Sequence, residues 1–125
     1  MNDKMVKLIR LAGLFAIVLI GVLSVVPGQL RPHVLASGQL EHFGAYCLAG
    51  FVLGFGYFDR LSVLSIAVGL SIYAGILEIA QLFIPGRGSR LIDFFASSSG
   101  AWTGIIIALL LYSMLGRKFI PNAQV

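Results

Sequence analysis

Charged residues are scarce in this chain, and their scarcity excludes most classes of protein. Only 11% of its 125 residues are Asp, Glu, Lys or Arg, whereas a soluble domain carries roughly 25%. Hydrophobic residues make up 58% of the chain, and its mean hydropathy is +0.97. So few charges cannot cover the surface of a soluble enzyme or a DNA-binding domain, and so many apolar residues exclude a disordered tail. The composition predicts a polytopic membrane protein that forms one domain over residues 1–125.

Several chemical motifs are also missing. The single cysteine, Cys47, cannot form an internal disulfide, and we interpret it as a small apolar residue within an apolar run. The chain has no phosphate-cradling glycine loop, no nucleophile elbow and no cysteine–histidine zinc arrangement. No dedicated metal site is therefore predicted, and the cofactor is left open.

Four apolar segments are long enough to cross a membrane, which takes roughly 20 residues of helix. The predicted helices cover residues 8–26, 40–58, 61–84 and 91–115. Pro27-Gly28 and Pro85-Gly86 end the first and the third of them. The second and third helices are joined by a very short connection, so we expect a tight antiparallel hairpin. The expected fold class is an all-α membrane protein, an antiparallel bundle of four transmembrane helices.

Lysine and arginine predict the orientation, because cytoplasmic flanks of transmembrane helices carry the excess. With a cytoplasmic N-terminus, the outer side carries Arg31, Arg87 and Arg90. We therefore expect both termini in the cytoplasm and a multi-pass location in the inner (cytoplasmic) membrane. The net charge of +4 then reflects topology, and no nucleic-acid partner is predicted. The basic residues on the inner side are Lys4, Lys7, Arg10, Arg60, Arg117 and Lys118.

A cleaved signal peptide is the alternative for the first helix, since basic residues precede its apolar run. Val34-Leu35-Ala36 resembles a small-residue cleavage site. However, the run is longer than a usual signal core, and Ala36 lies about ten residues past its end. A retained transmembrane helix is therefore favoured.

Strongly polar residues gather at predicted helix ends on the expected outer side. Two of them, Glu78 and Gln81, are three residues apart and so share one helix face. Intramembrane ionisable residues are by default candidates for function. The candidates are Glu41 and His42 at the start of the second helix, Glu78 and Gln81 near the end of the third, Arg87 and Arg90 in the next loop, and Asp93 in the first turn of the fourth.

Depth makes Glu78 the most unusual of these residues. At about 1.5 Å per residue, it would lie roughly 9 Å below the end of its helix at Ile84. A bare carboxylate there costs several kcal/mol unless it is paired or neutralised. Arg87, Arg90 and His42 are the expected partners, because they lie on the same side of the membrane.

Small residues recur at four-residue spacing in two of the predicted helices. Gly50 and Gly54 in the second helix, and Gly100 and Gly104 in the fourth, fit the pattern for close packing in lipid. One stripe of the fourth helix consists of Asp93, Ser97, Gly100 and Gly104.

Each polar candidate also has a purely structural explanation. Glu78 and Gln81 can simply form hydrogen bonds between helices. Asp93 can complement the helix dipole, and His42 can be an interfacial hydrogen-bonding residue. The two arginines can contact lipid headgroups. The functional interpretation therefore depends on the cluster as a whole.

Three sequence blocks, taken in order, resemble the VanZ-like family of small bacterial membrane proteins. The family pattern starts a helix with His-Phe-x-x-Tyr, continues with Glu-x-x-Gln-x-x-x-Pro-x-Arg, and ends with Asp followed by small residues and two glycines. The resemblance covers roughly residues 39–110. The matching residues are His42-Phe43-Gly44-Ala45-Tyr46, then Glu78, Gln81, Pro85 and Arg87, then Asp93, Gly100 and Gly104.

The chain departs from this family at two places. Gly38-Gln39 replaces an Asp-Lys pair that members often carry before the histidine, and Ser97-Ser98-Ser99 replaces a segment that often contains Asn. The resemblance implies an association with resistance to teicoplanin, a glycopeptide antibiotic. It does not supply a settled biochemical activity.

Two main hypotheses of function follow. In the first, the outward-facing cluster binds or modifies an anionic cell-envelope lipid or precursor, with Glu78 or Asp93 as general base or metal ligand. In the second, the cluster only holds the bundle together, and the chain is a non-enzymatic accessory protein. A small oligomeric transporter is less favoured, because no pair of broken helices is present. Whether the chain is an enzyme, and its protein partner, are left open. The first hypothesis assigns catalysis to His42, Glu78 and Asp93, and substrate binding to Glu41, Gln81, Arg87 and Arg90.

Overall fold

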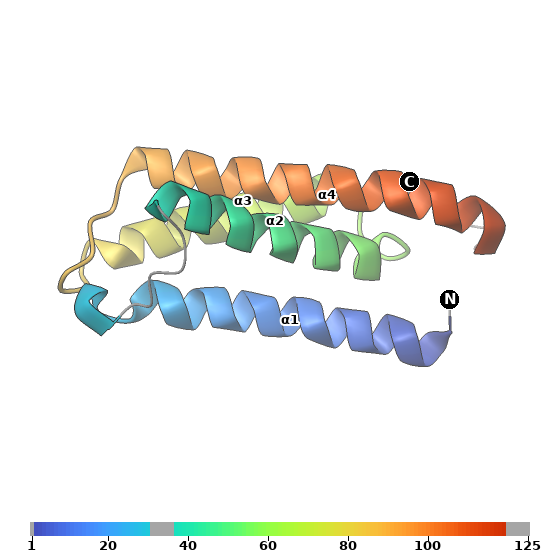
Figure 1. Cartoon of the computed structure of the whole chain (residues 1–125), viewed down its shortest axis with the longest axis horizontal. Helices are drawn as coiled ribbons and strands as arrows, with labels where there is room; N and C mark the ends of the chain where they lie inside the picture. Colours follow the sequence, from blue (N-terminus) through green and yellow to red (C-terminus); the bar gives the residue numbers. More distant parts are fainter. Residues whose placement is uncertain (1, 31–36, 120–125) are drawn as a thin grey trace.

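The computed structural model describes residues 2–30 and 37–119, and side chains as far as Leu115. Arg31 and Val34-Leu35-Ala36, which the orientation and cleavage predictions involve, lie outside the described residues, as do the side chains of Arg117 and Lys118. In the described part, the secondary structure consists of helices α1 (Asp3–Val25), η1 (Gly28–Leu30), α2 (Gly38–Tyr57), α3 (Val63–Gln81) and α4 (Leu91–Phe119) (Figure 1).

Three helices of the described chain are long and apolar enough to cross a membrane: α1, α3 and residues Leu91–Leu115 of α4. The remaining long helix, α2, has 20 residues. At 1.5 Å per residue it is about 30 Å long, which is also enough to cross a membrane. It is not among the helices apolar enough by composition, because its first two turns carry Gln39, Glu41 and His42. The expectation of an all-α protein with membrane character is confirmed.

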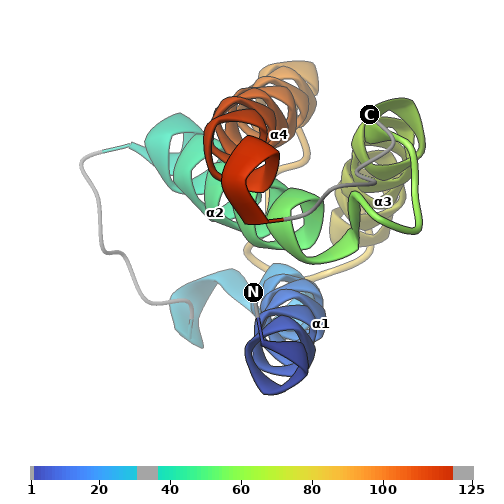
Figure 2. The same ribbon diagram turned by 90° about the vertical axis from the view of Figure 1, so that its right-hand side faces the viewer.

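The helices run alternately up and down the bundle (Figure 1). At one end, called the polar end here, α1 and α3 finish while α2 and α4 begin. Although residues 58–62 join α2 directly to α3, α2 makes its most extensive contact with α4 (Figure 2). The expected tight hairpin of the second and third helices is therefore not the main packing unit.

Glycine explains why α2 pairs with α4. A Cβ atom at Gly100 would overlap the backbone of Phe43, and one at Gly104 would overlap the backbone of Cys47. On the opposite side of the interface, Gly50 lies against the α4 backbone in the same way. Helices in lipid gain association energy from such close backbone packing, so the small-residue pattern predicted from the sequence is confirmed.

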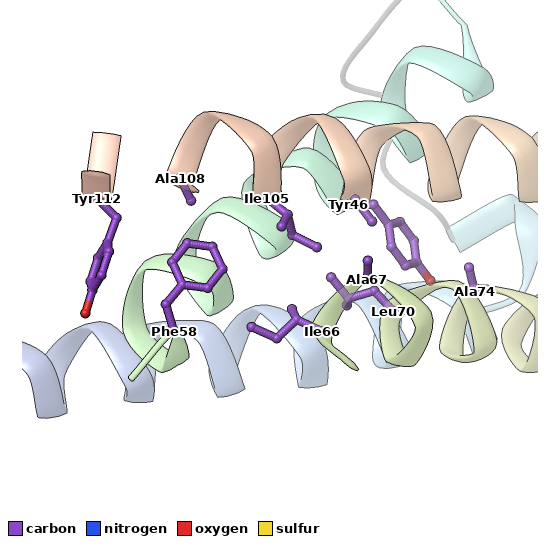
Figure 3. Packing of buried hydrophobic residues seen from close by; sticks show 10 residues of the cluster. Tyr46, Phe58, Ile66, Ala67, Leu70, Ala74, Ile105, Ala108 and Tyr112 are labelled. Carbon is purple, nitrogen blue, oxygen red and sulfur yellow. The ribbon is translucent and has the colours of Figure 1, made fainter. Parts of the chain in front are cut away.

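The buried apolar residues lie between α2, α3 and α4 (Figure 3). Tyr46 of α2 points toward Ala74 of α3 in this view. Near the other end, the rings of Phe58 and Tyr112 meet edge to face, with centroids 5.5 Å apart. The buried residues of this cluster are Tyr46, Phe58, Ile66, Ala67, Leu70, Ala74, Ala101, Ile105, Ala108 and Tyr112.

Helix α1 has a single buried residue, Gly13, and both apolar and polar contacts attach it to the bundle. Its partly buried Ile17 and Ile20 pack against the apolar core. Near its start, the Arg10 Nε donates to the Gly56 carbonyl oxygen (2.8 Å), and its Nη2 donates to both Asp59 carboxylate oxygens (2.8 Å each). Further along α1, the Tyr73 hydroxyl donates to the Ile17 carbonyl oxygen (2.7 Å). These bonds fix α1 beside α2 and α3.

Helix α3 ends at Gln81 rather than at Ile84 as predicted. The next three N–H groups donate to carbonyls three residues back, at 3.1–3.2 Å, which is the tighter 3₁₀ pattern. Pro85 disfavours α-helical geometry in the residue before it, so the helix unwinds early. Glu78 consequently lies about 4.5 Å from the end of the α-helix at 1.5 Å per residue, and the 3₁₀ turn continues beyond that end.

Candidate functional site

Three residues far apart in the sequence meet at the polar end of the bundle. His42 comes from the second turn of α2, Glu78 from the last turn of α3 and Asp93 from the first turn of α4. A ring nitrogen of His42 and one carboxyl oxygen from each acid all lie within 4.8 Å of one another. The structure thus brings together the three side chains that the sequence analysis assigned to catalysis.

Both acids are buried, Glu78 with 7% and Asp93 with 5% of its surface exposed. If both are ionised, charges no more than 4.8 Å apart repel by at least roughly 3 kcal/mol at an effective dielectric constant of about 20. Burial away from water adds a further cost for each carboxylate. The site therefore needs positive charge or a shared proton.

Neutral donors satisfy part of this need. The Ser89 hydroxyl donates to Glu78 Oε2 (3.1 Å), and the Gln39 amide donates to Asp93 Oδ1 (3.0 Å). The second oxygen of Asp93 lies 3.5 Å from the Nε of Arg90, whose side chain is 62% exposed. Because the Arg90 side of this pair is exposed to solvent and the contact is long, solvent weakens the attraction. One such pair does not offset two buried negative charges.

A hydrogen bond to α4 also orients His42. Its Nδ1 lies 3.4 Å from the hydroxyl of Ser97, which is one turn after Asp93 and almost completely buried. Which of the two atoms donates depends on the tautomer of the ring. This contact fixes the imidazole between α2 and α4, on the side of the acids.

A cavity of about 300 Å³ lies beside this cluster. Backbone from η1, from the start of α2 and from the loop between α3 and α4 forms part of its wall. Its volume is at the lower limit of ligand pockets, which suits a small polar group better than a lipid chain. Its polar lining comes from His42, Gln81, Arg87, Arg90 and Asp93.

The loop that forms this wall is fixed against η1. The Gly28 N–H donates to the Pro85 carbonyl oxygen (3.1 Å). A Cβ at Gly28 would overlap the backbone of Gly86, whose φ of +73° lies in the region that favours glycine. The two glycines therefore allow the loop to approach η1 closely enough to form this wall of the cavity.

Two of the predicted substrate-binding residues contact the end of α1. Arg87 donates through Nε to the Val26 carbonyl oxygen (2.8 Å) and through Nη2 to that of Leu23. The Gln81 amide donates to the Ser24 carbonyl oxygen (3.1 Å). The last carbonyls of a helix lack partners within it and favour a nearby positive charge. Both residues therefore stabilise the bundle as well as lining the cavity.

The other two predicted substrate-binding residues differ in position. Arg90 lines the cavity and is largely exposed, so its guanidinium can reach an incoming anion. Glu41 is half-buried in the first turn of α2 and does not line the cavity. Among the cations of the site, Arg90 is best placed to bind a ligand.

Sequence reasoning did not assign Gln39, Ser89 or Ser97 to the site, although it placed Ser97 on the same helix stripe as Asp93. Gln39 is three residues before His42, and Ser97 is four residues after Asp93. That spacing places each on the same helix face as a candidate, so it could have identified both. Ser89 had no comparable signal, since it lies in a loop whose path depends on the glycine contacts.

This arrangement supports three kinds of chemistry. The imidazole and the carboxyl groups can exchange protons, the same groups can ligate a cation, and the exposed guanidinium can bind an anion. Comparisons with protein-family models, curated proteins and solved structures found no match to this chain.

Proposed function

We propose that this chain is a VanZ-like protein of the inner (cytoplasmic) membrane that binds the phosphate-bearing headgroup of an anionic cell-envelope lipid or precursor. The observation that carries the proposal is the cavity at the polar end, with exposed Arg90 in its lining. Arginine matches phosphate geometry and retains its charge. The small volume of the cavity fits a headgroup, while the acyl chains stay in the bilayer.

The proposal includes four membrane spans with both termini in the cytoplasm. The length of α2 supports a fourth span, because 20 residues of helix match the roughly 30 Å hydrocarbon core. Lys4, Lys7, Arg10 and Arg60 lie at the end of the bundle opposite the site, which supports a cytoplasmic assignment for that end. The cavity would then face the outer leaflet, where envelope precursors are used.

In the catalytic form of this proposal, the cluster transfers a proton to or from the bound headgroup. His42 lines the cavity and, when it does not ligate a cation, acts as acid or base. Asp93 also lines the cavity, while Glu78 lies behind it and pairs with Ser89. Asp93 is therefore the carboxyl group better placed to act as a general base.

Headgroup binding by the purified protein in nanodiscs tests this function. The ligands are short-chain phosphatidylglycerol, short-chain phosphatidylcholine and inorganic phosphate. Replacing Arg90 with Gln removes a charge-assisted hydrogen bond, so we expect at least a roughly tenfold loss of affinity for the anionic lipid. Arg60→Gln is the matched control, because Arg60 is 69% exposed at the opposite end.

Three outcomes would count against headgroup recognition. Equal losses in the two arginine variants would mean that only overall charge matters. Equal affinity of the wild type for the two lipids would remove the preference for anions. Full competition by inorganic phosphate, at the same concentration as the lipid, would indicate a site for free phosphate.

A second candidate function is that of a non-enzymatic accessory protein. The hydrogen bonds from Gln81 and Arg87 to the end of α1 favour it, since they show polar groups holding helices together. Glu78→Gln separates the two functions, because it keeps the shape and hydrogen-bonding capacity of the side chain. A variant that accumulates normally but loses headgroup binding contradicts the accessory function. A variant that is degraded removes support for catalysis.

A further inference from the structure

We propose that His42, Glu78 and Asp93 bind one divalent transition-metal ion of the Zn²⁺ or Mn²⁺ class. An open coordination position of this ion would face the cavity and accept a phosphate oxygen of the ligand. The metal site itself stands on the geometry of the three side chains, and the phosphate contact rests on the proposed function.

The distances allow such a site with small movements. When three ligand atoms lie within 4.8 Å of one another, some point lies within about 2.8 Å of all three, compared with roughly 2.0–2.2 Å for zinc–ligand bonds. Each ligand atom would need to move by at most about 0.6–0.8 Å to reach such a bond length. Torsions about the side chains can supply this movement without any change in the helices.

The donor set indicates the class of metal. One imidazole nitrogen suits zinc and related ions, and two carboxylate oxygens also suit manganese. Three protein ligands are typical of catalytic metal sites, which keep at least one position for water or substrate. His42 and Asp93 also line the cavity, so the open position would face it.

Each proposed ligand is oriented by a hydrogen bond from another element or from a loop. Such outer contacts are a regular property of metal sites, where they fix the ligands and tune their basicity. All three proposed ligands have such a hydrogen bond, which would not be expected if the acids were close together only by chance. The pairs are Ser97 with His42 (3.4 Å), Ser89 with Glu78 (3.1 Å) and Gln39 with Asp93 (3.0 Å).

Charge supplies the second argument. Two buried carboxylates beside the cavity repel each other, and they also repel a phosphate. The nearby ion pair of Arg90 with Asp93 is 3.5 Å long, and its Arg90 side is exposed to solvent. A divalent cation would offset both carboxylates, which makes the same cavity attractive to an anion. The positive charge of the metal would therefore allow an anionic ligand to bind beside two acidic residues.

Metal titration of the full chain tests the site directly. The protein is purified in detergent micelles free of phosphate, treated with a chelator, and titrated with Zn²⁺ or Mn²⁺ alone. Calorimetry and elemental analysis should give one equivalent in the wild type. We expect at least a roughly tenfold lower metal affinity in His42→Gln, Glu78→Gln and Asp93→Asn. Mutation of a residue that only hydrogen-bonds to a metal ligand already lowers metal affinity by that factor.

Two variants provide matched controls. His33→Gln changes the other histidine of the chain, and Asp59→Asn changes a carboxylate at the opposite end; both should keep one equivalent with unchanged affinity. Absence of saturable binding in the wild type would overturn the proposal. Equal losses in the controls and the ligand variants would also overturn it, as would full binding in all three ligand variants.

A second measurement uses only the wild type and so does not depend on variants that fold. Co²⁺ added to the chelator-treated protein should give the visible absorption of a four- or five-coordinate ion with nitrogen and oxygen ligands, and Zn²⁺ should abolish it. The spectrum of hydrated Co²⁺ would overturn the site and would favour a proton shared by the two acids.

The metal site and the proposed function can fail separately. Arg90→Gln should retain the metal while it loses headgroup affinity, since Arg90 is not a ligand. Metal binding without headgroup binding in the wild type would contradict the proposed function alone. Headgroup affinity that is unchanged by the chelator would contradict the phosphate contact of the metal and leave the proposed function intact.

Discussion

Replacement of Gly104 by alanine should weaken the contact between α2 and α4. A Cβ at this position would overlap the carbonyl group of Cys47 and approach the backbone nitrogen of Phe51 within 2.8 Å. Both are backbone groups, so neither can rotate away, and the two helices must separate. Overpacking of this kind costs about 1–3 kcal/mol, while alanine recovers about 0.5–1 kcal/mol of helix propensity. We expect a net loss of about 1–2 kcal/mol.

The same separation should affect the site, because α2 carries His42 and α4 carries Asp93. Gly100 lies one turn closer to the site, against the backbone of Phe43, the residue after His42. Gly100→Ala should therefore reduce ligand and metal affinity more than Gly104→Ala, although both destabilise the bundle. This ranking links helix packing to the geometry of the cluster.

Unfolding of the purified variants in mixed micelles, followed by circular dichroism as denaturing detergent is added, measures the loss. Gly44→Ala in α2 and Gly69→Ala in α3 are the controls, since a Cβ at either position meets nothing within 4 Å. Both controls should be as stable as the wild type or slightly more stable. The reasoning is refuted if Gly104→Ala unfolds at the same detergent concentration as Gly44→Ala.

Three further predictions concern orientation and the attachment of α1. In a Cys47→Ala background, Phe83→Cys should react with a membrane-impermeant maleimide in intact cells, and Leu61→Cys only after permeabilisation; the reverse pattern would contradict the proposed topology. Arg10→Gln removes the bonds to Gly56 and Asp59 and should cost about 1 kcal/mol, because half-exposed Asp59 is screened by solvent. Hydrogen exchange should then accelerate in α1 but not in α4, and equal acceleration in both would argue against a local role. Arg87→Lys cannot reproduce the two-carbonyl contact of a guanidinium, so exchange should accelerate at the C-terminal end of α1, while headgroup affinity should fall less than in Arg90→Gln. A larger fall in Arg87→Lys would make Arg87 the main anion ligand.

The helices and their small-residue faces could be predicted because both depend on local patterns. Apolar runs bounded by Pro27-Gly28 and Pro85-Gly86 give the approximate bounds of α1 and α3. The spacing of Gly100 and Gly104 identifies the face of α4 that packs closely against another helix, without identifying that helix. The partner of that face was not predictable, since it depends on complementary glycines in another helix. The short connection between α2 and α3 favoured α3 as the main packing partner of α2. In the structure that partner is α4, because glycines allow the two backbones to approach closely.

The candidate site shows the same division. Spacing and residue type identified His42, Glu78 and Asp93, because acids and histidine near apolar helix ends are unusual. The contacts of Arg87 could not be predicted, since they depend on where the end of α1 lies relative to a loop. Sequence thus identified the chemical groups, while tertiary packing determined which of them line the cavity.

The central claim is that the polar end of the bundle binds a phosphate-bearing anionic lipid or precursor. Mass analysis of the lipids that co-purify with the protein from its native membrane tests this claim most directly, with Arg90→Gln and Arg60→Gln purified in parallel. We predict that the wild type and Arg60→Gln enrich one anionic phosphate-bearing species over the bulk membrane, and that Arg90→Gln does not. Lipid profiles that match the bulk membrane in all three proteins would contradict the claim.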